Sequence, residues 1–214
     1  MARVLIAVPT FENVSPDTFK ALWDMDKPCE CGFETVRGHD CATARNKMAQ
    51  LAIDGGYDYL MMVDSDVTPP KDALVNLLSH GKECVSGFYV HRNEANELTD
   101  STCACKLLMR NGVRYFDYPL ESEYTRRELA ELREKGEYLV EIHGGGMGCI
   151  LVKVEVFEKL PYPWFDWVNY KNDHRGMLSE DLYFCEKMRK GSIPRYVDTR
   201  VACGHLFRRI EGAL

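Results

Sequence analysis

The sequence predicts an α/β protein with a mostly parallel sheet flanked by helices. Short apolar runs alternate with segments of helical periodicity through about residue 90, which is typical of parallel strands joined by crossover helices. The apolar run that ends at Val63 is too short for a core helix, and Asp64-Ser65-Asp66 follows it. The 214 residues fit one domain with a sizeable core. We therefore expect a single domain over residues 1–214.

Strands and helices alternate in the first part of the chain. Besides the run that ends at Val63, strands are expected at 3–8, 33–37 and 83–88. A helix is expected at 16–25, because Ser15 suits the N-cap and Pro16 the first helical position. The apolar positions 44, 48, 51 and 52 have helical spacing before Gly55-Gly56, and a further helix is expected at 71–80.

The second part of the chain is less regular, and residues 91–136 are predicted to be an insertion. Residues 91–118 are expected to form a hairpin that turns at Asn111-Gly112. Residues 122–135 are dense in charge and predict a helix, either a solvated surface helix or a mobile flap. The remaining expected elements are strands at 138–142, 149–154 and 195–202, helices at 155–159 and 180–190, a glycine-rich loop at 144–148 and an aromatic loop at 162–167.

The composition is that of a soluble globular protein, with 45% apolar and 28% charged residues. A net charge of −6 argues against a generic nucleic-acid binder. The sequence holds no apolar run near the ~20 residues that a membrane span needs. The N-terminal apolar run is broken too early for a signal peptide, so we expect a cytoplasmic protein.

The nine cysteines include two Cys-x-Cys pairs, Cys29/Cys31 and Cys103/Cys105. Together the four thiols could bind a structural zinc ion, although their spacing is not that of a ribbon or finger. Reduced cytosolic thiols are the alternative.

Asp64 and Asp66 form an Asp-x-Asp (DXD) motif at the end of a predicted strand. Residues i and i+2 of an extended segment point the same way, so the two carboxylates should lie side by side. Ligands of open α/β sheets bind at the carboxyl ends of strands. Hard oxygen ligands on an open edge suit Mg²⁺ or Mn²⁺, whose other positions can be filled by water or diphosphate oxygens. The motif therefore predicts a metal-assisted nucleotide site.

Three further features can join this site. Glu180 and Asp181 follow Ser179 and serve either as dipole-favoured acids at a helix N-terminus or as a general base. His205 is either structural or a third metal ligand. The glycines at 144–146 and 148 are either tight turns or a surface that a ligand can approach closely.

The order of these motifs resembles that of the GT-A glycosyltransferases, especially small bacterial and phage-type members similar to family 2. The resemblance covers about residues 3–206 and implies a GT-A, Rossmann-like fold. Its most specific parts are the Asp-Ser-Asp context and the Ser179-Glu180-Asp181 helix start. The motifs that carry it also include Pro9-Thr10, Ala44-Arg45-Asn46, the glycine-rich loop, Pro163-Trp164-Phe165 and Gly204-His205.

The resemblance implies a role for each matching residue. The nucleoside would be contacted by Pro9, Thr10 and Asp40, and the diphosphate by Arg45. Asp64 would lie by the ribose or behind the metal, while Asp66 and His205, with Asp64 as a further candidate, would hold Mn²⁺ or Mg²⁺. Asp181 would be the catalytic base with Glu180 beside it. The acceptor would approach Gly145 and Gly146 and an aromatic edge formed by Trp164 and Phe165.

The implied activity is metal-dependent transfer of a sugar from a nucleotide-diphosphate donor, with a UDP-sugar favoured, to an unidentified hydroxyl acceptor. Residues 1–90 would be the nucleotide-binding half and 137–206 the acceptor and catalytic half. The basic segment 186–211 either grips the diphosphate, meets an anionic acceptor such as nucleic acid or lipid phosphate, or is simply solvated. A glycan acceptor is equally compatible with the sequence. The alternatives are a sugar nucleotidyltransferase and a nucleotide-sugar-binding module without activity.

Overall fold

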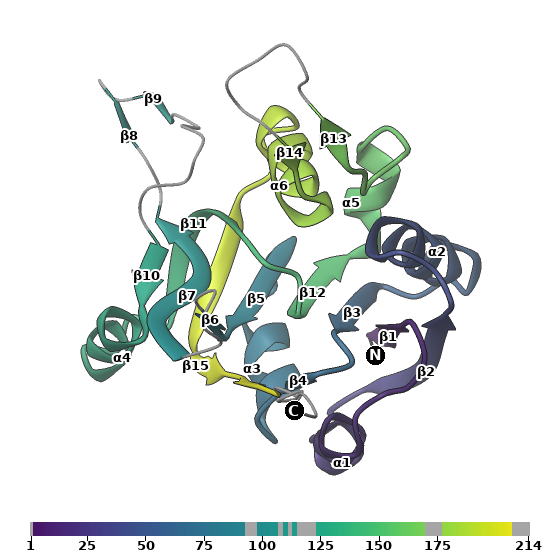
Figure 1. Cartoon of the computed structure of the whole chain (residues 1–214), viewed down its shortest axis with the longest axis horizontal. Coiled ribbons are helices and arrows are strands. Elements are labelled where there is room, and N and C mark those ends of the chain that lie inside the picture. Colours follow the sequence, from purple (N-terminus) through teal and green to yellow (C-terminus); the bar gives the residue numbers. More distant parts are fainter. Residues whose placement is uncertain are drawn as a thin grey trace, which may run out of the picture.

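One large sheet, covered by helices on both faces, organises the protein (Figure 1). The computed structural model describes residues 2–92, 98–106, 109–110, 113–114, 123–169 and 177–206. The strand order is β10-β7-β11-β15-β5-β12-β3-β1-β2, with β6 paired to β7. Strands β2, β1, β3, β5, β15 and β7 run in one direction, and β12, β11 and β10 run in the other. The predicted α/β class, with a mostly parallel sheet between helices, is confirmed.

The elements have the following bounds. The strands of the large sheet are β1 (Arg3–Thr10), β2 (Glu30–Arg37), β3 (Tyr59–Val63), β5 (Cys84–Phe88), β6 (Val90–Arg92), β7 (Leu98–Lys106), β10 (Glu123–Thr125), β11 (Leu139–Gly145), β12 (Cys149–Lys153) and β15 (Arg195–Ala202). Three short ribbons pair β4 (Val67–Thr68) with β16 (Gly204–His205), β8 (Met109–Arg110) with β9 (Val113–Arg114), and β13 (Val168–Asn169) with β14 (Met177–Leu178). The helices are α1 (Pro16–Asp24), α2 (Cys41–Asp54), α3 (Ala73–Ser79), α4 (Arg126–Glu134), α5 (Val154–Lys159) and α6 (Glu180–Lys190).

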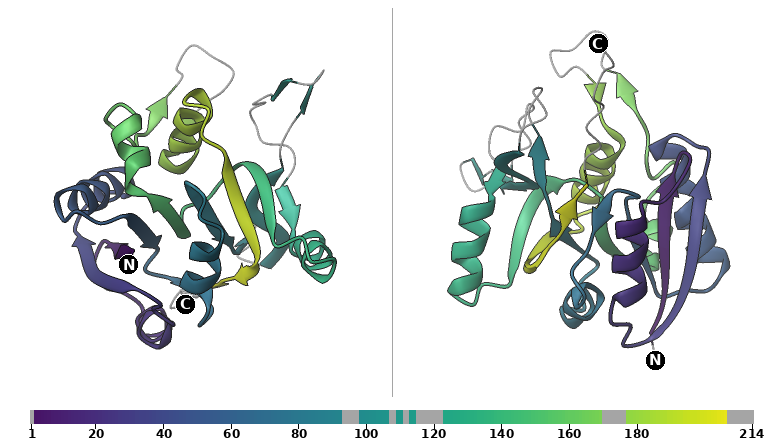
Figure 2. Two further views of the ribbon diagram at one scale, coloured as in Figure 1. Left: turned by 180° about the vertical axis from the view of Figure 1, so that it is seen from behind. Right: turned by 60° about the horizontal axis from the view of Figure 1, so that its bottom comes forward.

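The apolar residues of the central strands alternate between two cores. Leu5 and Ala7 of β1 lie in a cluster with residues of α2, α5 and α6. Val4 and Ile6 lie in a second cluster with residues of α1, α3 and α4. Because successive side chains of a strand point to opposite faces, a continuous apolar run fills both layers of a sheet. The views of Figure 2 show the helices on both sides, with α4 at one end of the sheet and β2 at the other.

Strand β12 was predicted, but its antiparallel direction was not evident from the sequence. It pairs with β3 and β5 at once, with Cys149 beside Val63 and Ile150 beside Ser86. The run Cys149–Val154 predicts a buried strand, but an apolar run carries no information on direction. The insertion of β12 separates β3 from β5 and brings the glycine-rich loop to the end of β3, because Asp64 N donates to the carbonyl of Gly148 at 3.0 Å.

The predicted insertion is integrated with the sheet rather than separate from it. Strand β7 pairs with β11, and α4 packs its fully buried Leu129 into the second cluster. Thr125 and Glu128 form a capping box at the start of α4. A helix anchored in this way is a surface helix rather than a mobile flap. The predicted turn at 111–112 lies outside the described residues, and the flanking β8 and β9 pair antiparallel as a hairpin requires.

The four thiols that could have formed a zinc site lie far apart. Cys29 and Cys31 are at β2, and Cys103 and Cys105 are on β7, with six strands between the two in the sheet order. Seven strand spacings of ~4.8 Å put the two pairs about 34 Å apart. One ion therefore cannot bind all four. Within the described residues, no helix is both long enough and apolar enough to cross a bilayer.

Candidate functional site

Arg45 joins two carboxylates at the carboxyl end of the sheet. It lies on α2, and its Nη2 donates to Asp64 Oδ1 at 2.9 Å, directly after β3. Its Nε donates to Glu180 Oε1 at 3.3 Å, in the first turn of α6. The side chain of Arg45 is only 4% exposed, against 26% for Asp64 and 8% for Glu180. One guanidinium therefore fixes three segments that are far apart in the sequence.

The charges of this cluster shift one another's ionisation. Burial alone would lower the pKa of Arg45, but Asp64, Glu180 and Asp181 together raise it. Burial raises the pKa of Glu180, opposed by Arg45 and assisted by Asp181. The Nη1 atom of Arg45 is buried and makes no hydrogen bond to any residue that the structure describes. The Nε and Nη2 atoms of Arg45 bond the two carboxylates, and its expected contact with a diphosphate stays a prediction.

Asp66 and His205 face each other across the β4–β16 ribbon. Val67 pairs with His205 and Thr68 with Gly204. The backbone N–H of Leu206 donates to the carbonyl of Asp66 at 2.7 Å. These contacts place His205 Nε2 3.7 Å from Asp66 Oδ2. The nearby carboxylate of Asp66 raises the pKa of His205, burial opposes the rise, and the carbonyl of Val90 supports it.

The same pair fits a divalent cation as an incomplete site. Asp66 offers a half-exposed carboxylate, and His205 offers an imidazole whose other ring nitrogen, Nδ1, lies 3.3 Å from the carbonyl of Val90. Such a contact orients a ligating histidine. Asp64 is less available as a metal ligand, since its Oδ1 already accepts a hydrogen bond from Arg45. The described part of the chain assembles no group of three or more His, Cys, Asp and Glu, so a bound ion would need further oxygens from its ligand or from water.

Tyr89 is a site residue that sequence reasoning missed. It follows β5, is 9% exposed, and packs edge-on against His205 with the ring centres 4.9 Å apart. Its hydroxyl accepts from the backbone N–H of Gly148 at 3.3 Å. Burial raises the pKa of Tyr89 well above its usual value, so the hydroxyl stays protonated. Its position after an apolar strand at the same sheet edge as Asp64 was the signal that could have found it.

The glycine-rich loop is held close to the protein itself. A Cβ on Gly145 would lie 2.4 Å from the carbonyl oxygen of Cys103, and one on Gly146 would lie 2.2 Å from Tyr89 Oη. Arg195, which is buried, donates to the carbonyls of both glycines at 2.6 Å. The glycines thus allow close approach of β7 and Tyr89. Their predicted contact with an acceptor stays a prediction.

The acids at the start of α6 have different surroundings. Glu180 is buried on Arg45, whereas Asp181 is partly exposed and accepts hydrogen bonds through Oδ1 from Ser179 Oγ and from Leu182 N. Ser179 occupies the N-cap position, but its hydroxyl bonds Asp181 rather than the helix backbone. Asp181 is therefore the carboxylate of the pair that a ligand can reach.

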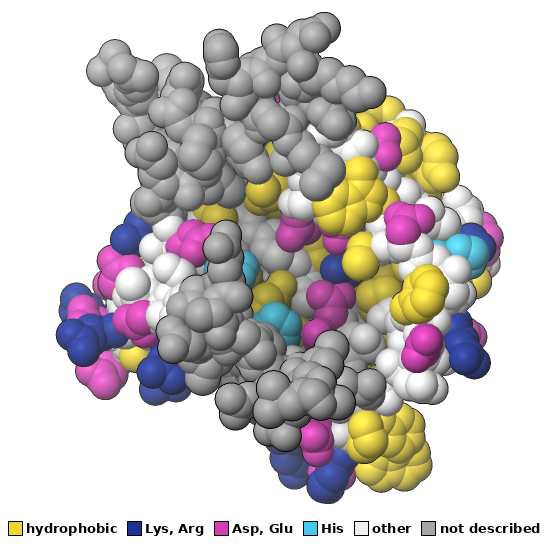
Figure 3. Space-filling model, viewed as in Figure 1, with side chains coloured by type: hydrophobic (Ala, Val, Ile, Leu, Met, Phe, Trp, Pro, Cys, Tyr) yellow, Lys and Arg dark blue, Asp and Glu magenta, His cyan; other side chains and the backbone are white. Residues whose placement is uncertain are grey.

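An open pocket of about 630 Å³ adjoins Asp66. Its described lining comes from the loop after β1, the start of α1 and the Asp-Ser-Asp turn: Thr10, Phe11, Glu12, Asn13, Ser15, Pro16, Asp17, Ser65, Asp66 and Leu206. Pro9 is buried beside it, and Asp40 caps α2 by accepting from Thr43 N at 3.1 Å. Figure 3 shows acidic and histidine side chains around the hollow at the centre of this face.

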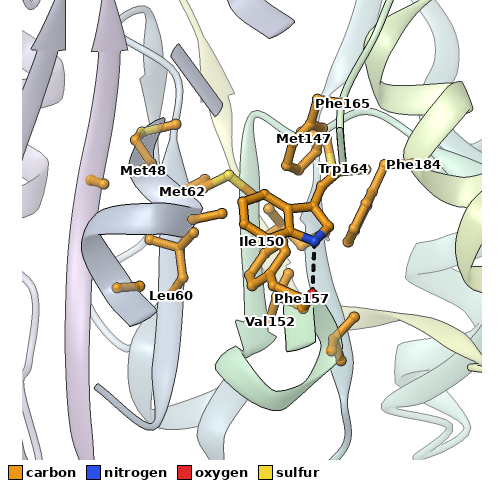
Figure 4. Packing of buried hydrophobic residues seen from close by; sticks show 14 of the residues in the cluster. Met48, Leu60, Met62, Met147, Ile150, Val152, Phe157, Trp164, Phe165 and Phe184 are labelled. Atoms are coloured by element: carbon orange, nitrogen blue, oxygen red, sulfur yellow. Dashed lines mark hydrogen bonds between the residues drawn. The ribbon is translucent and has the colours of Figure 1, made fainter. Parts of the chain in front are cut away.

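Trp164 and Phe165 do not form an acceptor-facing edge, and this expectation was wrong. They are 5% and 1% exposed and pack with Phe157 and Phe184 in the first core cluster (Figure 4). Trp164 Nε1 donates to the carbonyl of Phe157 at 2.7 Å. Asn46 Oδ1 accepts from the backbone N–H groups of both residues. An aromatic loop with prolines resembles a surface loop in sequence. The long-range hydrogen bonds from this loop to Asn46, which hold it in the core, cannot be predicted from the sequence.

Several basic side chains of segment 186–211 bind other groups of the protein. Lys187 donates to the carbonyls of Pro161 and Pro163, and Arg195 is buried. Lys190 pairs with Glu186. Residues 207–211 lie outside the described part. The described portion of this segment is therefore not a free cationic surface.

Comparison with known proteins identifies the fold. No family model and no curated protein matches the chain. The structure of A197 from STIV is similar, with a TM-score of 0.60 and 17% identity over 96% of this chain and 86% of that chain. GalNAc-T7, solved with UDP, GalNAc and Mn²⁺, gives a TM-score of 0.57 and 11% identity over 97% of this chain and 44% of that one. S. aureus TarS, solved with UDP-GlcNAc, gives a TM-score of 0.52 and 13% identity over 99% of this chain and 60% of that chain.

These likenesses establish a GT-A-like α/β fold, as the motif order implied. The chain spans less than two thirds of the GalNAc-T7 and TarS chains. At such low identity the likeness concerns the fold alone.

Proposed function

We propose that this chain is a metal-dependent glycosyltransferase that moves a sugar from a nucleotide-diphosphate donor, favoured as a UDP-sugar, to a hydroxyl acceptor. The observation that carries the proposal is the presence of two charged clusters at one sheet edge: the carboxylates of Asp64 and Glu180 on the buried Arg45, and the pair Asp66 and His205 beside an open pocket. The GT-A-like fold, seen in one neighbour with UDP and Mn²⁺ and in another with UDP-GlcNAc, supports it.

The pocket beside Asp66 is the proposed nucleotide site. Thr10 ends β1 at its wall, with Pro9 next to it in the strand, and Asn13 and Ser65 add polar groups. Asp40, at the N-terminus of α2, is proposed to reach the nucleoside from the neighbouring strand end. Ligands of open α/β sheets bind outside the carboxyl ends of strands, which is where these residues lie.

Asp66 and His205 are proposed to hold Mn²⁺ or Mg²⁺ together with oxygens of the donor. Such an ion, when bound, would neutralise charge on the leaving diphosphate as a Lewis acid. The residues themselves do the positioning. Arg45 holds Asp64 and Glu180 in place, the carbonyl of Val90 orients the His205 ring, and Tyr89 packs against that ring.

Asp181 is the proposed base. It is the partly exposed carboxylate at the start of α6, and its Oδ1 is oriented by Ser179 and Leu182. A base of this kind accepts the proton of the attacking hydroxyl and typically contributes about 10²–10⁴-fold to the rate. Glu180 lies beside it but is bonded to Arg45 and buried, so its proposed part is to hold the geometry.

The decisive experiment measures release of nucleoside diphosphate from a panel of nucleotide sugars with Mn²⁺ or Mg²⁺. We expect one donor, a UDP-sugar, to be turned over by the wild-type protein. Asp66→Ala should abolish this release, whereas its matched control Asp24→Ala, at an exposed acid of α1, should behave as wild type. Tight binding of a nucleotide sugar without any turnover would favour a binding module, and pyrophosphate release from a nucleoside triphosphate would favour a nucleotidyltransferase. Neither binding nor release with any donor would contradict the proposal.

A further inference from the structure

A second open groove, distinct from the pocket beside Asp66, lies between α4 and the strands β5, β6, β7 and β15. Its volume is about 700 Å³. Apolar residues form part of its wall, and three arginines of one helix reach it. The described lining residues are Phe88, Val90, Thr99, Asp100, Arg126, Arg127, Ala130, Arg133, Thr199 and Ala202.

The groove is cationic on a chain that is acidic as a whole. Three arginines against the one acid Asp100 give it a net charge of +2, while the chain carries −6. Arg126, Ala130 and Arg133 lie four and three residues apart and therefore on one face of α4. Arg126 Nε lies 3.8 Å from Asp100 Oδ1, a weak pair between exposed side chains.

The other two arginines are available to a ligand. The side chains of Arg127 and Arg133 are exposed and form no ion pair or hydrogen bond with the residues that the structure describes. A guanidinium donates two parallel hydrogen bonds to a phosphate, and several in one groove bind the anion more strongly than one. The hydroxyls of Thr99 and Thr199 donate to the carbonyls of His91 and Glu137, so recognition depends on the arginines.

The inner wall of the groove supports the segment that carries His205. The carbonyl of Val90 contacts His205 Nδ1 at 3.3 Å, and the carbonyl of Phe88 accepts from Cys203 N at 2.8 Å. Ala202 ends β15 just before that segment. A molecule held in the groove therefore lies against the strand ends that lead to the Asp66–His205 pair.

We propose that this groove is a second binding site, which takes the phosphate group of a small phosphorylated sugar or polyol. The groove volume suits a small molecule. Single-stranded nucleic acid is usually bound by stacking its bases on accessible aromatic rings. Among the described lining residues the aromatic one, Phe88, is 5% exposed and offers no such ring face.

The test uses the full chain and titrates it calorimetrically with glycerol 3-phosphate and with inorganic phosphate. The groove variant is Arg126→Gln/Arg127→Gln/Arg133→Gln. Its matched control is Lys20→Gln/Lys159→Gln/Lys190→Gln, which removes three charges from exposed i,i+4 pairs elsewhere. We expect wild type and control to bind both probes, the groove variant to lose about tenfold or more in affinity, and binding to weaken at high salt.

Binding of UDP with Mn²⁺ is measured on the same three proteins and should be equal in all of them. If none of the three proteins binds UDP with Mn²⁺ while wild type and control still bind phosphate, the proposed function is contradicted and the anion-binding groove is supported. Equal phosphate binding by wild type and groove variant, or no binding by wild type, would overturn the groove proposal. Arginine-dependent binding of phosphatidylglycerol vesicles or of a short oligoribonucleotide, without binding of glycerol 3-phosphate, would also overturn it in favour of a lipid surface or nucleic acid.

Discussion

The Nη2 atom of Arg45 donates to Oδ1 of Asp64 at 2.9 Å, and this bond ties helix α2 to the end of β3. The same guanidinium bonds Glu180 at the start of α6. Arg45 and Glu180 are buried and Asp64 is partly buried, and two carboxylates share one cation, so neither acid is independent of Arg45.

Arg45→Ala should therefore be strongly destabilising. It leaves the buried Glu180 and the partly buried Asp64 without their counter-charge, and breaking a buried pair in this way costs about 3–5 kcal/mol. Arg45→Lys should recover only part of this, because a single ammonium cannot reproduce the fork. Urea unfolding measures both. Lys159→Ala, in an exposed pair with Glu155, is the control and should change the unfolding free energy by less than about 1 kcal/mol. Equal effects at the two positions would contradict a buried junction.

Much of the scaffold could be predicted from local pattern. The run ending at Val63 and the helical spacing around Arg45 follow from side-chain periodicity, which is a property of a few neighbouring residues. The strand-end position of Asp64 and Asp66 follows from the same pattern. These are the parts where local propensity and the tertiary structure agree.

What could not be predicted depends on contacts across the chain. The Arg45–Glu180 bond joins residues 135 positions apart. The hydrogen bond from Trp164 N to Asn46 Oδ1 joins residues 118 positions apart. The resemblance implied that His205 lies near Asp66, but the β4–β16 ribbon that brings them together consists of two-residue strands without a periodic signal. Tyr89 was missed because a buried tyrosine beside a strand resembles any core residue.

Trp164→Ala should act on stability rather than on an acceptor. It removes a buried indole and leaves the carbonyl of Phe157 without its donor, and truncations of this kind cost about 3–5 kcal/mol. Tyr162→Ala, two residues away and 70% exposed, should be nearly neutral. Thermal or urea unfolding of the two variants distinguishes a structural role of Trp164 in the core from a role in acceptor binding. A stable Trp164→Ala protein with altered acceptor kinetics would restore the acceptor-facing interpretation.

The start of α4 should lose stability in acid through Glu128. The hydrogen bond from Lys106, followed by the backbone N–H of Thr125, lowers the pKa of this carboxyl. A lowered pKa means that the ionised form stabilises the native state above the unfolded value and that this contribution fades as pH falls through the native value. Glu128→Gln keeps the capping box without the charge.

The measurement is unfolding free energy against pH for wild type and Glu128→Gln. Their difference should be largest near neutral pH and should shrink as the pH falls below the usual range for glutamate. A constant difference at all pH values would assign the effect of the substitution to packing rather than to the ionised carboxylate.

Asp66→Ala should abolish metal-dependent nucleotide binding with little change in folding. The carboxylate is 54% exposed, and its contact with His205 at 3.7 Å is long for an ion pair, so the fold gains little from it. Calorimetry with UDP should show an affinity that Mn²⁺ enhances in wild type, that EDTA removes and that Asp66→Ala lacks. Asp24→Ala serves again as the exposed acidic control. Full activity of wild type in EDTA would remove the metal from the mechanism.

Substitution of the two acids at the start of α6 should have different effects on activity and stability. Asp181→Asn keeps the size of the side chain and an oxygen that can accept from Leu182 N, so folding and UDP binding should survive. If Asp181 is the base, transfer should fall by about a hundredfold or more. Glu180→Gln, by contrast, weakens the buried bond with Arg45 and should lower stability as well as activity. Steady-state transfer and urea unfolding are measured on both variants. Near-wild-type transfer by Asp181→Asn would exclude it as the base and leave the mechanism open, including to a retaining reaction that uses no such base.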